Sequence, residues 1–294
     1  MSSIIPISVN YHLTRLCNFN CKFCFHTEIS SSHLSFQEAK QGLRELQKHG
    51  MKKINFSGGE PFIIEKGEFL GKLCIYCKKE LKIESVSIIC NGSLVTEFWF
   101  QKYAHYIDVF GVSIDSFEED TLVEIGRYGV EGVVGLDKLY AIRTWCAKYG
   151  LKFKINTVVT KQAICEDMIP HIRELQPDRW KVFQCLLLDG ENVGPNALRD
   201  AAQCIVKLAE FRDWIHRHAE LSPVVESNEL MMNSYLILDE KMRFLNCTKG
   251  RKDPSSSILD VGLLKALLEA GHDEQTFYNR GGYYEWCKTK RLHR

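Results

Sequence analysis

The sequence predicts an α/β protein built on a parallel sheet. Six short runs rich in β-branched and aromatic residues recur along the 294 residues, and segments with helical patterns separate them. Strands that alternate with helices are typical of consecutive βα units, which connect by right-handed crossovers. Such units form either an open doubly wound sheet or a barrel, and in both folds the chemistry collects at the C-terminal ends of the strands.

The positions of the elements follow from these runs. The predicted strands are residues 9–14, 53–60, 85–92, 108–115, 152–159 and 180–188. The predicted helices are residues 35–50, 67–81, 94–106, 133–150 and 168–176. The first helix has clear end signals, because Ser35 and Glu38 can form a capping box and Gly50 can end the helix. We expect a catalytic domain, residues 1–190, followed by a C-terminal extension, residues 191–294.

Composition and charge exclude several classes of protein. The hydrophobic fraction of 45% and the charged fraction of 26% are ordinary for a globular protein. A net charge of +1 gives no case for a nucleic-acid surface or a polybasic membrane contact. The chain has no run of 18 apolar residues and no secretory signal at its start. We therefore expect no nucleic-acid partner and no membrane attachment from this chain.

Twelve cysteines are many for this length, and three of them are special. Cys17, Cys21 and Cys24 form a C-x3-C-x2-C cluster directly after the first predicted strand. The others are scattered, mostly through apolar stretches, where a free cysteine behaves as a small hydrophobe. Because disulfide frameworks belong to small secreted domains, we expect a reducing, cytoplasmic location.

Three kinds of site compete for this cluster. Three buried structural thiols are a poor explanation for such close spacing, with Asn and Lys between the cysteines. A structural zinc site needs four ligands, but His26 is too near Cys24, and Cys74 and Cys77 fit a packed helix face better. A [4Fe–4S] cluster is normally held by four cysteines. Three would leave one iron open to a small molecule.

The cluster and the end of the second strand together resemble the signature of radical S-adenosylmethionine (SAM) enzymes. That end reads Ser57-Gly58-Gly59-Glu60-Pro61. The resemblance implies a partial (β/α)6 barrel, a [4Fe–4S] cluster on the three cysteines, and SAM chelated to the fourth iron. One electron would then cleave SAM and release a 5′-deoxyadenosyl radical. The implied SAM contacts are Phe23, Ser57, Gly58, Gly59, Glu60, Asn91 and Ser113.

Longer segments resemble one family of radical SAM enzymes, the viperins, over almost the whole chain. They include "VNYHLTRLCNFNCKFCFHT", "KINFSGGEPF", "SYLILDEKMRFLNC" and "RGGYYEW". The resemblance implies conversion of a pyrimidine nucleoside triphosphate, CTP or UTP, into its 3′-deoxy-3′,4′-didehydro form. The 4′ hydrogen would be abstracted and the 3′ hydroxyl lost as water. Such a product terminates chains made by viral polymerases, so the implied role is antiviral.

A nucleoside triphosphate carries about four negative charges, so its pocket needs several cations. By the resemblance, the cations that bind it are Lys53, Arg127, Lys154, Arg179 and Lys181. Asn156, on the same strand face as Lys154, would read the base or ribose, and Asn55 would also contact substrate. Tyr235 would lie near the ribose and supply a hydrogen.

The C-terminal tail is implied to cover the nucleotide. Arg280-Gly281-Gly282 would let backbone N–H groups approach the terminal phosphate, because a radical reaction needs solvent excluded. The implied partners are an electron donor and the iron–sulfur assembly machinery. Here the chain departs from animal viperins, which end in a tryptophan that recruits this machinery. This chain ends in "KRLHR", with Trp286 eight residues earlier, and we expect no membrane helix of the family's N-terminal kind within residues 1–294.

Two alternatives remain open on sequence alone. One is a radical SAM enzyme acting on another nucleotide, on RNA or on a peptide. The near-zero net charge argues against a large RNA, and the lack of a cysteine-rich extension argues against auxiliary clusters. The other is a pseudoenzyme or binding protein with a structural cluster. A structural role, however, does not require the glycine-rich strand end or five barrel cations.

Overall fold

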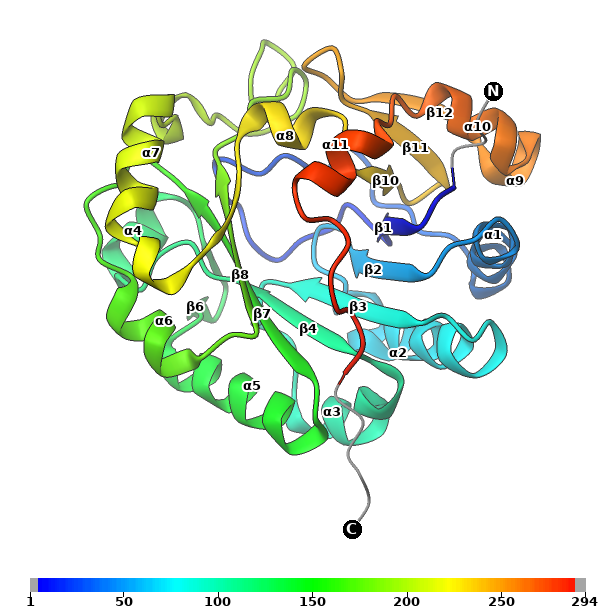
Figure 1. The fold of residues 1–294 in the computed structure, drawn as a ribbon, viewed down its shortest axis with the longest axis horizontal. Helices are drawn as coiled ribbons and strands as arrows, with labels where there is room; N and C mark the ends of the chain where they lie inside the picture. Colours follow the sequence, from blue (N-terminus) through cyan, green and yellow to red (C-terminus); the bar gives the residue numbers. More distant parts are fainter. Residues whose placement is uncertain (1–4, 289–294) are drawn as a thin grey trace.

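The computed structural model describes residues 5–288 and shows a curved, mostly parallel sheet with helices on its outer face (Figure 1). The sheet has ten strands in the order β12-β11-β10-β1-β2-β3-β4-β7-β8-β9. Six central strands correspond to the predicted ones, and each is parallel to its neighbours. They are β1 (Ser8–His12), β2 (Lys53–Ser57), β3 (Ser85–Cys90), β4 (Val109–Ser113), β7 (Lys152–Val159) and β8 (Arg179–Gln184). The predicted α/β barrel-like fold is confirmed.

The helices cover the outside of this sheet. Five match predicted helices: α1 (Phe36–Lys48), α2 (Glu68–Ile75), α3 (Glu97–Tyr103), α5 (Leu136–Tyr149) and α6 (Ile169–Leu175). The capping box of Ser35 and Glu38 is present at the start of α1. A π-helical turn, Tyr76–Glu80, continues α2. The sequence analysis missed α4 (Glu119–Glu124), α7 (Leu208–Arg217) and the short hairpin of β5 (Tyr128–Gly129) and β6 (Gly132–Val133).

The residues after 190 extend the same sheet at both edges. On one edge β9 (Val224–Glu226) pairs parallel with β8, and on the other β10 (Leu236–Leu238) pairs parallel with β1. Beyond β10, the strand β11 (Arg243–Asn246) pairs antiparallel with β10, and β12 (Asp253–Ser257) pairs antiparallel with β11. The two predicted segments, residues 1–190 and 191–294, therefore share one sheet. Besides α7, the helices of this part are α8 (Asn228–Met232), α9 (Ile258–Val261), α10 (Leu263–Glu269) and α11 (Glu274–Asn279).

Alternation along the strands separates an apolar outer face from a polar inner one. In β7, Phe153 and Ile155 are fully buried against the helices, whereas Lys154 and Asn156 lie on the opposite face. The outer face and the helices enclose one large hydrophobic core, which includes Cys74 and Cys77 of the α2 region. No helix within residues 5–288 is long and apolar enough to cross a membrane.

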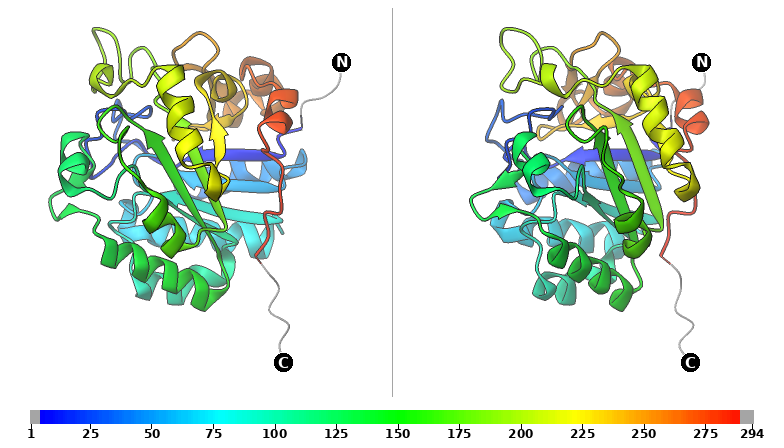
Figure 2. Two further views of the ribbon diagram at one scale, coloured as in Figure 1. Left: turned by 60° about the vertical axis from the view of Figure 1, so that its left-hand side comes forward. Right: turned by 90° about the vertical axis from the view of Figure 1, so that its left-hand side faces the viewer.

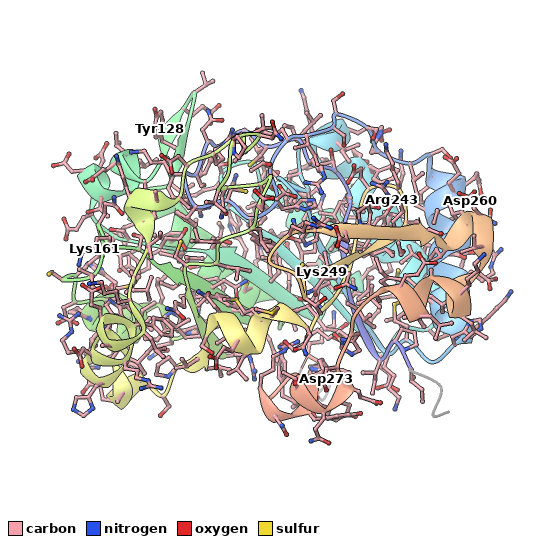
Figure 3. The ribbon with its side chains drawn as sticks, turned by 90° about the horizontal axis from the view of Figure 1, so that it is seen from above. Tyr128, Lys161, Arg243, Lys249, Asp260 and Asp273 are labelled. Atoms are coloured by element: carbon pink, nitrogen blue, oxygen red, sulfur yellow. The ribbon has the colours of Figure 1, made fainter. Side chains whose placement is uncertain are left out.

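The C-terminal tail crosses the N-terminal ends of the central strands (Figure 2). Ser85, which begins β3, donates to the carbonyl of Trp286 over 3.1 Å, and Lys152, which begins β7, donates to that of Glu285 over 2.8 Å. Trp286 is buried. Seen from above, Lys161 after β7 and Asp260 of α9 lie at opposite sides of the molecule (Figure 3). The final "KRLHR" lies outside the described residues.

Candidate active site

The inner face of the sheet encloses a cavity of about 300 Å³. Of the residues predicted for cluster, SAM and substrate, all except Glu60 line it. They are Cys17, Cys21, Phe23, Cys24, Lys53, Asn55, Ser57, Gly58, Gly59, Asn91, Ser113, Arg127, Lys154, Asn156, Arg179, Lys181, Tyr235, Arg280, Gly281 and Gly282. Because the strands are parallel, residues that follow them gather at one end of the cavity and residues that begin them gather at the other.

The three cysteines lie at the end reached by the C-termini of the strands. Burial raises the pKa of Cys17 to about 12 and that of Cys24 to about 11, so both thiols are protonated when no metal is bound. A cysteine binds a metal as the thiolate, so metal binding displaces the proton of the thiol. Neither cysteine is in a disulfide. All three cysteines are free thiols, the donor type that binds an iron–sulfur cluster.

The three cysteines line one cavity, but they do not form a single-ion site. Within residues 5–288, no group of three or more His, Cys, Asp or Glu side chains is placed to hold one metal ion. A [4Fe–4S] cluster makes a different demand, because its cysteines bind separate irons rather than one centre. Three thiols on one cavity wall meet that demand.

The two glycines after β2 are required by close contact with the cysteine loop. Gly58 has φ +145°, and a Cβ there would lie 2.5 Å from the carbonyl oxygen of Thr14. A Cβ on Gly59 would lie 2.1 Å from that of Leu16. The N–H groups of Gly59 and Glu60 donate to the carbonyls of Thr14 and Leu16 over 2.7 and 2.8 Å. The glycines thus hold the cysteine loop against the end of β2.

The Glu60 side chain binds backbone N–H groups and does not line the cavity. Its fully buried carboxylate accepts hydrogen bonds from the backbone N–H groups of Phe62 (3.1 Å) and Asn91 (2.8 Å). It therefore ties the end of β2 to the end of β3, and its predicted contact with SAM stays a prediction. The side chain of Asn91 donates to Asn18 of the cysteine loop over 2.9 Å.

Arg127 lies at the cysteine end and not with the other predicted phosphate ligands. Its guanidinium pairs with Asp115 at 3.0 Å, contacts the Cys21 Sγ at 3.6 Å and donates to the carbonyl of Ser113. Gly126 makes this possible, because a Cβ at its φ of +77° would lie 2.3 Å from the carbonyl oxygen of Asn20. This placement suits a cofactor contact better than a triphosphate contact.

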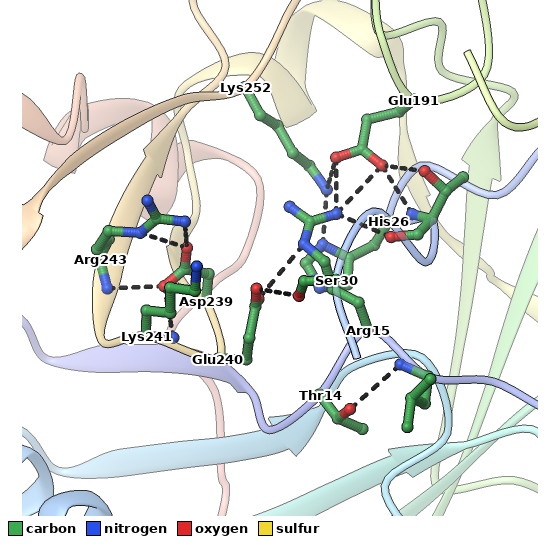
Figure 4. A network of polar contacts seen from close by, with 12 residues as sticks. Thr14, Arg15, His26, Ser30, Glu191, Asp239, Glu240, Lys241, Arg243 and Lys252 are labelled. Atoms are coloured by element: carbon green, nitrogen blue, oxygen red, sulfur yellow. Dashed lines mark hydrogen bonds and ion pairs between the residues drawn. The ribbon is translucent and has the colours of Figure 1, made fainter. Parts of the chain in front are cut away.

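A buried network of charges clamps both ends of the cysteine loop (Figure 4). Arg15, two residues before Cys17, pairs with Glu191 at 2.9 Å. The same carboxylate accepts from the N–H and the hydroxyl of Thr27, three residues after Cys24, each over 2.7 Å.

Other groups complete this clamp from the C-terminal part of the chain. Lys252 pairs with Glu191 at 3.4 Å, and Glu240 pairs with Arg15 at 3.3 Å. Asn192 donates to the carbonyl of Phe23 over 3.1 Å. These residues were not predicted from the sequence, because the cysteine-loop residues that Glu191, Asn192 and Glu240 contact lie more than 150 positions away in the chain.

The opposite end of the cavity is crowded with positive charge. Burial, together with Lys181 and Lys53, lowers the pKa of Lys154 well below its usual value. Burial and the neighbouring Arg179 and Lys181 do the same to Lys53. Mutual repulsion of buried cations is costly unless an anion joins them. The cations gathered here are Lys53, Lys154, Arg179, Lys181 and Arg280.

Two residues that the sequence analysis missed complete this end. Glu226, the last residue of β9, is fully buried and pairs with Lys181 and with Arg280. Tyr284 of the tail accepts a hydrogen bond from Lys53 over 3.0 Å. A carboxylate after two valines, in "PVVES", is the sequence signal that could have identified Glu226.

The glycines of Arg280-Gly281-Gly282 end helix α11. The N–H of Gly281 donates to the carbonyl of Tyr278 over 3.0 Å, and that of Gly282 donates to Phe277 over 2.9 Å. With Gly281 at φ +70°, this is a Schellman motif. Both N–H groups are therefore engaged in the helix end, unlike the predicted phosphate contact, and the Gly281 carbonyl accepts from Arg179 over 2.9 Å.

Amide side chains line the cavity between its two ends. Asn10 of β1 and Asn55 of β2 are register partners, and Asn156 lies on β7. The Oδ1 of Asn156 is buried and has no hydrogen-bond partner in the described part of the chain. An unpaired buried acceptor is costly, so this atom is suited to receive a donor from a ligand.

A model of the radical SAM superfamily matches residues 11–175, more than half of the chain. The chain is therefore a member of the radical SAM superfamily, whose characteristic cofactors are a [4Fe–4S] cluster and SAM. SuiB of Streptococcus suis, solved with SAM bound, superposes with a TM-score of 0.66 at 19% identity, over 93% of this chain and 67% of SuiB. At this identity the likeness shows the fold alone.

Proteins with similar sequences identify one family within this superfamily. The S-adenosylmethionine-dependent nucleotide dehydratase RSAD2 of Oncorhynchus mykiss is 54% identical over 289 residues, 98% of this chain and 82% of the relative. The S-adenosylmethionine-dependent nucleotide dehydratase of Flammeovirga pacifica is 33% identical over 97% of each chain. The chain belongs to this family of nucleotide dehydratases, and its resemblance to the viperins is confirmed.

Proposed function

We propose that this protein dehydrates a pyrimidine nucleoside triphosphate, CTP or UTP, to the 3′-deoxy-3′,4′-didehydro nucleotide. The observation that carries the proposal is one cavity with three thiols at one end and five basic side chains at the other. When bound, the cluster and SAM supply reductive cleavage of SAM and abstraction of the ribose 4′ hydrogen. The basic end supplies charge-assisted contacts to a polyphosphate.

The order of residues along the cavity orients this substrate. Lys53 begins β2 and Ser57 ends it, so the two cavity ends lie roughly 13 Å apart along the strand. The triphosphate binds the five cations at the basic end. The ribose then lies between the two ends, beside the amide side chains of Asn10, Asn55 and Asn156. There Asn156 and Asn55 contact the ribose or base, and Tyr235, whose hydroxyl lies 2.6 Å from Lys181, reaches the ribose from the basic end.

At the cysteine end we assign Cys17, Cys21 and Cys24 to the cluster. Phe23, Ser57, Gly58, Gly59, Asn91, Ser113 and Arg127 surround SAM. Arg127 suits a carboxylate, because a guanidinium forms paired hydrogen bonds with that group. Gly281 and Gly282 shape the cavity wall through the end of α11.

The reaction also requires partners. Loss of the 3′ hydroxyl as water consumes a proton, and the overall chemistry consumes reducing equivalents, so we propose an electron-donor protein as a partner. We also propose loading of the cluster by iron–sulfur assembly factors, and a reducing, cytoplasmic location. The product would act as an antiviral chain terminator.

The test is an anaerobic assay of the reconstituted protein with SAM, dithionite and each of the four ribonucleoside triphosphates. We expect one pyrimidine nucleotide to stimulate formation of 5′-deoxyadenosine and to yield a product lighter by one water. Stimulation by a purine nucleotide would replace the proposed substrate. SAM cleavage that no nucleotide stimulates would leave a radical SAM enzyme of another substrate class.

A further inference from the structure

Glu226 stands out as a buried carboxylate inside a site built for anions. It ends the edge strand β9 and is fully buried. One of its oxygens, Oε1, pairs with Lys181 and with Arg280, the latter at 3.1 Å. The other oxygen, Oε2, accepts the hydroxyl of Tyr235. Three groups from β8, the start of β10 and the tail therefore meet on one carboxylate.

These contacts determine the direction of the Tyr235 hydroxyl. Lys181 donates to the Tyr235 oxygen over 2.6 Å, and that oxygen in turn donates its proton to Glu226. A hydroxyl has one proton and two acceptor positions. With the proton on the Glu226 side and one acceptor position filled by Lys181, one acceptor position remains to face the cavity.

The same carboxylate connects the tail to Tyr235. The guanidinium carbon of Arg280 lies 3.8 Å from the centroid of the Tyr235 ring, and Arg280 also donates to the carbonyl of Ser234 over 3.0 Å. Arg280 is at the end of α11, where the tail begins. Glu226 therefore fixes the Tyr235 ring through the tyrosine hydroxyl. It also binds Arg280, whose guanidinium stacks on that ring.

Binding of a triphosphate does not explain a carboxylate at this position. A negative charge beside a polyphosphate opposes its binding by Coulomb repulsion. The hydrogen bonds of Glu226 instead orient groups that face the substrate. Loss of Glu226 would remove a repelling charge but also release Lys181 and Arg280, two opposing effects on affinity, so the main effect is expected in turnover through Tyr235.

We propose that Glu226 is a positioning residue for the nucleotide reaction, which orients the Tyr235 hydroxyl and Lys181 and attaches the tail through Arg280. The inference rests on the proposed function, since it concerns the same cavity. Glu226 does not need to touch the substrate for this role.

The test compares Glu226→Gln with the wild-type holoenzyme in the nucleotide-dependent SAM cleavage assay. Glutamine has one acceptor oxygen where Glu226 has two, so it cannot serve the cations and the tyrosine at once. We expect kcat to fall about tenfold or more, while KM for the nucleotide stays within about threefold or decreases. An unchanged kcat, or a loss that appears only as a higher KM, would overturn the inference.

A double-mutant cycle with Tyr235→Phe tests whether Glu226 acts through the tyrosine. Tyr235→Phe keeps the ring on which Arg280 stacks and removes the hydroxyl alone. We expect it to lower kcat, and we expect Glu226→Gln to cause little further loss in that background. A wild-type kcat in Tyr235→Phe, or two fully additive losses, would contradict the inference even if Glu226→Gln failed to fold.

Asp239→Asn is the matched control. Asp239 is also fully buried and pairs with an arginine, Arg243, at 2.6 Å, but it lies in the turn after β10. We expect Asp239→Asn to lower the melting temperature without the kcat loss. If wild type itself shows no stimulation by nucleotides, the proposed function fails. If wild type is stimulated and Glu226→Gln matches it, the positioning role alone fails.

Discussion

The ring of Tyr284 stacks on the guanidinium of Arg179, with 3.8 Å between the ring centroid and the guanidinium carbon. The hydroxyl of Tyr284 accepts from Lys53, which begins a different strand. A residue of the C-terminal tail thus contacts two of the cations that we assign to the triphosphate. The tail closes the basic end of the cavity by binding the residues that would hold the substrate.

Replacing Tyr284 should therefore weaken nucleotide binding. We expect Tyr284→Ala to raise KM for the nucleotide by about tenfold, because both a cation–π contact and a hydrogen bond are lost. Tyr284→Phe should have a smaller effect, since it keeps the ring. Tyr283→Ala is the control, because the neighbouring Tyr283 is half exposed. Equal KM values for Tyr284→Ala and Tyr283→Ala would contradict this account of the tail.

Replacing any one of the three clustered cysteines should abolish the cofactor. We expect Cys17→Ala, Cys21→Ala and Cys24→Ala to lose the iron–sulfur absorbance and all SAM cleavage after anaerobic reconstitution. Cys165→Ala is the control, because Cys165 is exposed and is not among the residues that line the cavity. An intact cluster in any of the three variants would refute that ligand.

Lys181 should contribute mainly to substrate binding. Removing a buried cation that holds a phosphate costs about 1.5–3 kcal/mol, or roughly 10- to 150-fold in KM. We expect Lys181→Ala to show this increase in steady-state kinetics. Lys161→Ala, at an exposed ion pair beyond the end of β7, should keep the wild-type KM. An unchanged KM in Lys181→Ala would count against a phosphate contact.

Nucleotide binding should weaken above pH 8. Burial lowers the pKa of Lys181 to about 8, although Glu226 opposes the shift and Arg280 and Arg179 add to it. Below that pH the side chain is a cation that attracts phosphate, and above it the charge is lost. We expect KM to be flat up to about pH 8 and to rise beyond it by up to about tenfold per pH unit. Lys181→Arg should make the rise shallower, since arginine keeps its charge.

The buried clamp on the cysteine loop should matter for stability. Removing one partner of a buried ion pair leaves an uncompensated charge and costs about 3–5 kcal/mol. We expect Glu191→Ala to lower the free energy of unfolding by this amount in a denaturant titration, and to reduce cluster content. Glu220→Ala breaks an exposed pair with Arg173 and should cost at most about 1 kcal/mol. Similar losses in both variants would mean that Arg15 and Lys252 find other partners.

The sequence predicted the central strands well because their signal is local. The run 152–159 alternates apolar and polar residues, and β7 spans those residues. The strands β9 to β12 have three to five residues each and gave no such signal. β9 pairs with β8 and β10 with β1, and β11 and β12 add to the sheet beyond β10, so their stability depends on pairing that a local pattern cannot reveal.

It was easier to predict which residues lie at the site than what each of them contacts. The resemblance to the viperins placed Glu60, Arg127 and Gly281 near the site, but it could not say which way a side chain or N–H group points. Glu60 faces the backbone at the end of β3, Arg127 faces Asp115, and the Gly281 N–H faces its own helix. Such directions depend on partners that are distant in sequence.

The sequence by itself determined the class of chemistry. The cysteine spacing, the glycine-rich end of β2 and the strand cations specify a three-thiol site and an anion site on one parallel sheet. The tertiary structure alone decided how that site is held, because Glu226, Tyr284 and Glu191 act through partners that become neighbours when the sheet closes. Sequence motifs identify the groups that contact the ligand, whereas buried ion pairs depend on packing between segments that are distant in the chain.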